Sequence, residues 1–150
     1  MARLIAMFLT LLFAACAQKP DTLEREFEKM LTGVTLVGNF TLGDGKTLRE
    51  EKYTIEKVSK IGGDMWMFQT RIQYGKRDVS LPLPLPVKWA GDTAMVTLTD
   101  MNLPGLGTYT ARVLFYRDQY AGTWSAKDHG GHLFGRIVRA GAGAPPTPPK

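Results

Sequence analysis

From residue 33 onward, apolar and polar residues alternate along the chain with a period of two. The clearest segment places Trp66, Phe68 and Ile72 on one face of an extended chain. The same alternation returns at 109–115 and 120–126. Successive side chains of a strand point to opposite faces of the sheet. The pattern therefore predicts strands with one buried and one solvated face.

Short segments rich in glycine and aspartate separate these alternating stretches. They lie at 43–45, 62–64, 75–76, 91–92, 104–107, 118–119 and 128–131. A spacing of mostly about 10 to 15 residues between turn signals is typical of an all-β sandwich or barrel. No helical pattern separates the strands, so about eight or nine of them are expected to pair antiparallel as a meander. We predict a β-barrel domain over 33–139, with a β-sandwich as the alternative.

One strand carries a proline at every second position, at Pro82, Pro84 and Pro86. Alternate residues of a strand direct their N–H groups to the same neighbour, so these prolines remove the donors on one side only. The segment is therefore predicted to pair fully along one edge, and a barrel should have its gap here. The leucines between the prolines are typical of a core, which disfavours the alternative of a polyproline ligand.

A short helix is predicted before the strands, within a spacer at 17–32. Asp21 followed by Glu24 has the spacing of a capping box. Leu23, Phe27, Met30 and Leu31 then form one apolar stripe, and Gly33 suits the end of a helix. Mixed acidic and basic residues on the other face are unlike a membrane-lying helix, so we expect the stripe to pack on its own domain.

Residues 1–16 have the features of a secretory signal sequence. Arg3 provides a positive start, and 4–15 are apolar except for Thr10. Such a run is too short to cross a membrane, which needs about 20 apolar residues. Small residues follow at Ala14, Ala15 and Ala17, as at a cleavage site. We therefore expect export to the periplasm or cell envelope.

Cys16 is the only cysteine of the chain. The segment from Phe13 to Cys16 resembles the lipobox of bacterial lipoproteins, and this resemblance implies that Cys16 carries a lipid anchor after cleavage. The alternative is ordinary cleavage near Ala17, which would release a soluble secreted protein. In either case the folded domain has no internal cysteine, which excludes a cysteine nucleophile or a thiolate metal site.

The charge of the chain is positive but scattered. After removal of 1–16, 18 basic and 14 acidic residues remain, and the longest basic run is Lys76-Arg77. Nucleic-acid binders usually carry a clustered basic patch, so we expect no nucleic-acid partner. The final segment, 140–150, contains only alanine, glycine, proline, threonine and lysine and is expected to be a disordered tail.

Both histidines of the chain lie in one glycine-rich turn, at His129 and His132, next to Asp128. Two imidazoles and a carboxylate form a ligand set that Zn²⁺ accepts. The competing interpretation is a hairpin with solvent-facing histidines, because Asp-His-Gly-Gly favours a turn by itself. The neighbouring Glu50 and Glu51 are a poor acid–base pair, because adjacent strand residues point to opposite faces.

An aromatic face offers a second candidate site. The residues that would line a barrel interior are Trp66, Phe68, Tyr109, Tyr120 and Trp124. Barrels of about eight strands either fill with side chains or hold one small ligand. We expect a non-enzymatic module without a cofactor that binds a small apolar or amphipathic ligand. The alternatives are a structural or protein-interaction domain with a filled barrel, and a metal-dependent enzyme at the Asp128–His132 turn.

Four segments, 80–92, 103–113, 120–125 and 128–135, resemble a family of exported bacterial proteins to which no function is assigned. The resemblance extends from Leu31 to Val138 and implies export alone. The meander of strands and the Gly122-Thr123-Trp124 segment are similar, at the level of fold, to lipocalin-like barrels. Fold-level similarity does not by itself imply a function.

Overall fold

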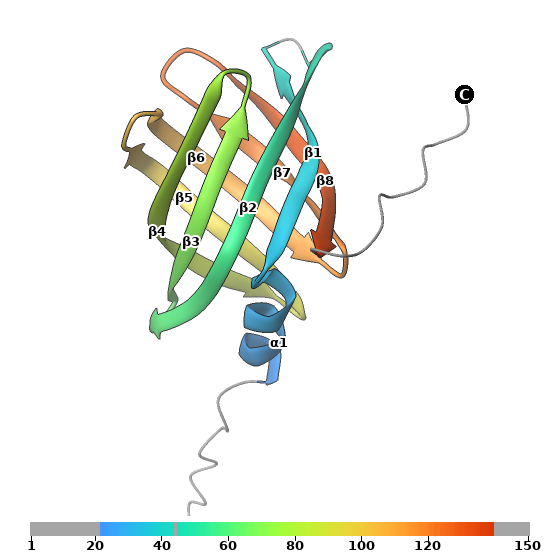
Figure 1. Ribbon diagram of the computed structural model, residues 1–150, viewed down its shortest axis with the longest axis vertical. Coiled ribbons are helices and arrows are strands. Elements are labelled where there is room, and N and C mark those ends of the chain that lie inside the picture. Colours follow the sequence, from blue (N-terminus) through green and yellow to red (C-terminus); the bar gives the residue numbers. More distant parts are fainter. Residues whose placement is uncertain (1–21, 44, 140–150) are drawn as a thin grey trace, which may run out of the picture.

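The computed structural model describes residues 22–43 and 45–139, which form one helix and eight strands (Figure 1). The elements are α1 (Thr22–Leu31), β1 (Val34–Leu42), β2 (Thr47–Gly62), β3 (Met65–Tyr74), β4 (Arg77–Ala90), β5 (Thr93–Leu103), β6 (Gly107–Tyr116), β7 (Gln119–Ser125) and β8 (Gly130–Arg139). The predicted signal sequence, Asp21 and the predicted tail at 140–150 lie outside the described residues.

The eight strands form a closed antiparallel barrel in chain order. Each strand pairs with its neighbour in the sequence, and β1 closes the sheet by pairing with β8 from Val34↔Arg139 to Phe40↔Leu133. The predicted all-β barrel is therefore confirmed, and the alternative of a β-sandwich is wrong. The closure depends on pairing between strands at opposite ends of the domain, which no local sequence pattern reports.

The proline-containing strand interrupts the hydrogen-bonded ladder, as predicted. β4 pairs with β3 along ten residues, from Tyr74↔Arg77 to Met65↔Pro86. It pairs with β5 only at the four residues from Val87 to Ala90. The leucines between the prolines face the interior, where Leu83 and Leu85 are buried. The missing donors of three prolines thus leave a gap in the pairing of β4 with β5.

The helix closes one end of the barrel (Figure 1). Phe27 and Leu31 are buried, and Phe27 meets Trp66 edge-on with ring centroids 5.1 Å apart. Trp89 and Phe115 contact the same ring from β4 and β6. The predicted helix packs on its own domain, as expected. However, α1 belongs to the core of the barrel and is more than a spacer before it.

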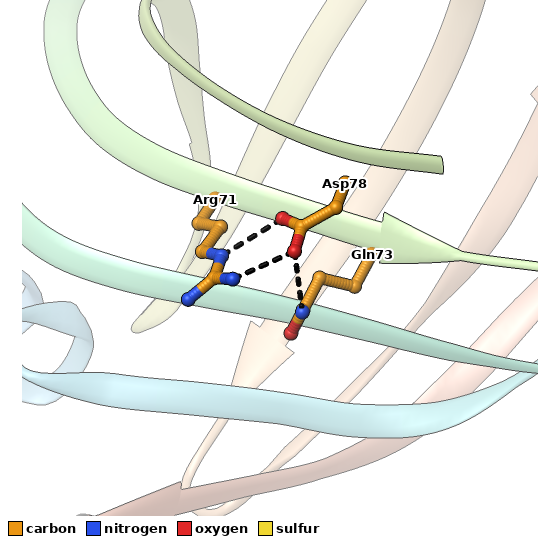
Figure 2. Close-up of polar contacts among 3 residues, drawn as sticks. All are labelled: Arg71, Gln73 and Asp78. Atoms are coloured by element: carbon orange, nitrogen blue, oxygen red, sulfur yellow. Dashed lines mark hydrogen bonds and ion pairs between the residues drawn. The ribbon is translucent and has the colours of Figure 1, made fainter. Parts of the chain in front are cut away.

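The opposite end of the barrel carries the turns after β1, β3, β5 and β7. An ion pair on the outer surface stabilises the β3–β4 hairpin beside this end (Figure 2). Arg71 donates from Nε and Nη2 to the two carboxylate oxygens of Asp78, at 2.8 and 2.6 Å, and Gln73 donates to Oδ2 at 3.1 Å. The hydrogen bonds from Arg71 lower the pKa of Asp78.

Among residues 22–43 and 45–139, α1 is too short and too polar to cross a membrane.

Candidate functional site

The barrel encloses a cavity of about 940 Å³. Residues from all eight strands line it, and most of the wall is apolar. Representative wall residues are Leu36, Ile55, Ile72, Leu83, Val96 and Leu133. The cavity reaches the turns opposite α1, where Gly75, Lys76, Leu106 and His129 surround its open end. Its other end is closed by Phe27 and the aromatic rings around it.

Four of the five predicted aromatic residues line this cavity. They are Phe68, Tyr109, Tyr120 and Trp124. Trp66 faces the barrel interior but does not line the cavity, because it is buried against Phe27 at the closed end. Trp66 and Phe68 share one face of β3, as the alternation predicted. Because α1 fills the closed end, Trp66 packs against the helix, and only Phe68 reaches the cavity.

A buried carboxylate interrupts the apolar wall. Glu51 on β2 is 3% exposed and lines the cavity. Its Oε2 atom accepts a hydrogen bond of 2.7 Å from the Tyr53 hydroxyl, and its Oε1 atom accepts one of 2.9 Å from the Tyr120 hydroxyl. Buried glutamates are rare unless they are paired, so these three residues are the most unusual polar feature of the interior. We refer to them as the Glu51 cluster.

Two glycines allow Tyr120 to reach Glu51. The register places Tyr120 on β7 opposite Gly135, Gly135 opposite Gly38, and Gly38 opposite Glu51, so the four residues form one row across the wall. A Cβ atom on Gly38 would lie 2.5 Å from the Tyr120 hydroxyl oxygen, and one on Gly135 would lie 2.7 Å from Tyr120 Cε1. Both distances are too short for non-bonded contact. The tyrosine ring therefore occupies the space that these two side chains would need.

Burial controls the acidity of the cluster. Desolvation raises the pKa of Glu51, and the hydrogen bonds from Tyr53 and Tyr120 oppose this shift. Burial and the adjacent Glu51 together raise the pKa of Tyr120, which keeps this hydroxyl protonated as a donor. Among the described residues, no Lys, Arg or His nitrogen lies within 4.0 Å of the Glu51 carboxylate.

The sequence contained a signal for Glu51 that the adjacent-carboxylate argument did not use. Tyr53 and Ile55 lie two and four positions after Glu51 and face the interior. Extending this period-two alternation backward along β2 places Glu51 on the same face. Glu50 is exposed whereas Glu51 is buried, as expected for adjacent residues of a strand. The role of Tyr120 as a partner had no local signal, because 69 residues separate it from Glu51.

The three predicted metal ligands do not converge on one point, although two of them are in contact. His129 Nδ1 lies 2.7 Å from Asp128 Oδ1, and both side chains are at least half exposed. His132 lies in β8, exposed, and pairs with Thr123. Within 22–43 and 45–139, no group of three or more His, Cys, Asp or Glu side chains is arranged to hold a metal ion. β8 begins between the two histidines, and its alternation directs His132 outward. His129 lies before the strand and packs edge-on against Trp124.

Basic side chains lie around the open end of the cavity. Arg49, Lys76 and Arg77 line it and are exposed. Arg77 also donates a hydrogen bond of 2.6 Å to the carbonyl oxygen of Gly105 in the β5–β6 turn. The site thus combines a basic rim, an apolar wall and one buried acidic group.

This arrangement is suited to binding. A large apolar cavity with a few convergent polar groups is the usual form of a small-molecule site. The Glu51 cluster supplies hydrogen-bonding groups within it, and the turns at the open end give solvent access. No protein-family model, curated protein or solved structure matches the chain.

Proposed function

We propose that the barrel binds one small apolar or amphipathic molecule in its interior. The observation that carries this proposal is the cavity of about 940 Å³, which has an apolar wall and one open end. Sites for small molecules usually measure about 300–1,000 Å³, so the cavity has the size of a complete ligand site. Burial of apolar ligand surface against the wall would supply the driving force, at about 25 cal/mol per Å².

The cavity supports this function over the alternatives. A purely structural or interaction domain was expected to have a filled barrel, as small barrels can. Here the side chains from α1 fill only the closed end. A metal-dependent enzyme at the Asp128–His132 turn lacks the convergence of ligands on which that hypothesis depended.

The proposed location is the cell envelope, with a lipid on Cys16. Five residues separate Cys16 from the start of α1, and a fully extended chain from Cys16 to Thr22 would span at most about 22 Å. Since α1 lies at the closed end of the barrel (Figure 1), an anchor at Cys16 would hold that end toward the membrane. The open end of the cavity would then face away from the membrane.

A cavity-filling substitution tests the binding function. Ala111 lines the cavity from β6, whereas Ala121 is exposed on β7. Ala111→Phe should abolish binding of an uncharged environment-sensitive dye, such as Nile red, and Ala121→Phe should leave it unchanged. Native mass spectrometry of the purified protein should also detect a co-purifying small molecule. Failure of the wild-type protein to bind either the dye or any small molecule would refute the proposal.

The anchor is tested separately. Mass spectrometry of the mature N-terminus should show a diacylated or triacylated Cys16, and Cys16→Ala should move the protein from the membrane fraction to the soluble fraction. A mature chain that begins at an unmodified residue after Cys16 would reduce the proposal to simple secretion.

A further inference from the structure

The Glu51 cluster presents only hydrogen-bond acceptors to the cavity when its carboxylate is ionised. A tyrosine hydroxyl has a single proton, and both hydroxyl protons are used in the bonds to Glu51. The Glu51 carboxylate oxygens have further lone pairs, and these can only accept. A ligand group that complements these oxygens must therefore be a donor.

The charge of the cluster further restricts the chemical class of the donor group. The Glu51 carboxylate is buried and has no basic partner within 4.0 Å among the described residues. A buried charge without a counter-ion is costly unless it is paired or changes its protonation state. A cationic group that entered the cavity would compensate this charge and donate to the Glu51 carboxylate at the same time.

The residues packed around Glu51 hold its carboxylate at one position in the cavity wall. Gly38 and Gly135 leave the space in which the Tyr120 ring crosses two strands to reach Glu51. Tyr53 holds the second carboxylate oxygen from the same strand. Both oxygens are thus oriented beside the apolar surface. Gly38 is the middle residue of β1, which places the cluster at about half the depth of the barrel.

From this geometry we infer that the ligand is an apolar molecule bearing a protonated amine, which pairs with the Glu51 carboxylate inside the cavity. This inference rests on the proposed binding function. The basic rim of Arg49, Lys76 and Arg77 would favour the opposite class, an amphiphile with an anionic head group. These three side chains are exposed, and charges in solvent are screened over about 8 Å at physiological salt. The charge of the buried Glu51 is screened far less. Glu51 therefore determines the preference for a cationic over an anionic ligand.

Displacement of Nile red by three probes of equal chain length tests the inference. The probes are dodecylamine, 1-dodecanol and dodecanoate, each below its aggregation concentration. Dodecylamine should bind the wild-type protein at least about tenfold more tightly than either of the others, as expected for one added charge-assisted interaction. Glu51→Gln should remove this advantage and leave the affinity for 1-dodecanol within about threefold. Glu56→Gln, an exposed change of the same charge on β2, should leave all three affinities unchanged.

The outcomes separate the inference from the proposed function. Equal affinities for dodecylamine and 1-dodecanol, tightest binding of dodecanoate, or an amine preference that survives in Glu51→Gln would each overturn the inference while binding itself stands. Absence of binding by the dye and all three probes would overturn both. If Glu51→Gln does not fold, the comparison of the three probes on the wild-type protein decides the question.

Discussion

The hydroxyl of Tyr120 on β7 donates a hydrogen bond of 2.9 Å to the carboxylate of Glu51 on β2, across the two strands that lie between them. The ring can do so because Gly135 and Gly38 occupy the intervening positions in the row. This bond connects the first half of the barrel to the last across the β1–β8 closure. It also orients the only carboxylate that is buried among the described residues.

Removal of this hydrogen bond should destabilise the fold. Tyr120→Phe leaves the ring in place but deprives the buried carboxylate of one donor, and a lost hydrogen bond to a charged group costs about 1.5–3 kcal/mol. Urea unfolding should report this decrease in the free energy of unfolding. Tyr116→Phe, at an exposed tyrosine on β6, should stay within about 0.5 kcal/mol of wild type. Equal stabilities of the two variants would contradict the assigned role of Tyr120.

A side chain at Gly38 should be poorly tolerated. In Gly38→Ala the new Cβ would lie 2.1 Å from the carbonyl oxygen of Phe134 and 2.5 Å from the Tyr120 hydroxyl. The backbone and the ring must both move, and overpacking of this kind costs about 1–3 kcal/mol. Thermal unfolding should show a lower Tm than in Thr123→Ala, an exposed change on β7. A wild-type Tm would show that the row is not tightly packed.

The stability of the protein should depend on pH through Glu51. Because burial raises the pKa of this group, the folded protein binds the proton more tightly than the unfolded chain. The contribution of Glu51 to stability is therefore complete below the unfolded pKa and is lost as pH rises through the folded pKa. Glu51→Gln does not titrate, so its Tm relative to wild type should increase as the pH rises above the unfolded-state pKa of glutamate. A difference that stays constant with pH would disprove this assignment.

The closed end of the barrel should depend on Phe27. Truncation of this ring removes edge-on contacts with Trp66, Phe68, Trp89 and Phe115. Phe27→Ala should lower the free energy of unfolding by about 3–5 kcal/mol, the usual cost of deleting a buried phenylalanine. Arg25→Ala, on the exposed face of α1, serves as the control and should change it by less than about 0.5 kcal/mol. Similar values for both variants would mean that α1 does not close the barrel.

Several elements could be predicted because their causes are local. The alternation around Trp66 and Phe68 follows directly from strand geometry, and the stripe through Phe27 and Leu31 follows from helix geometry. The gap beside β4 was also predictable, because a proline lacks its N–H group wherever it occurs. For the candidate site, the same alternation identified four of the seven Phe, Tyr and Trp side chains that line the cavity, namely Phe68, Tyr109, Tyr120 and Trp124.

Other features depended on contacts between distant parts of the chain. Trp66 was placed on the correct face of β3, yet its distance from the cavity depends on how far α1 inserts into the barrel end. His132 follows His129 closely in the sequence but faces outward, because the start of β8 sets the phase of the alternation. A sequence pattern predicts which residues share a face but not how deep each one lies.

The residues alone thus establish an all-β domain with an N-terminal helix, because strand and helix periodicities are properties of neighbouring side chains. Three features arise only when residues far apart in sequence meet: the closure of β1 on β8, the interior cavity and the pairing of Glu51 with Tyr120. These features depend on the register and the strand number of the whole barrel, which set its diameter and therefore whether its side chains can fill it.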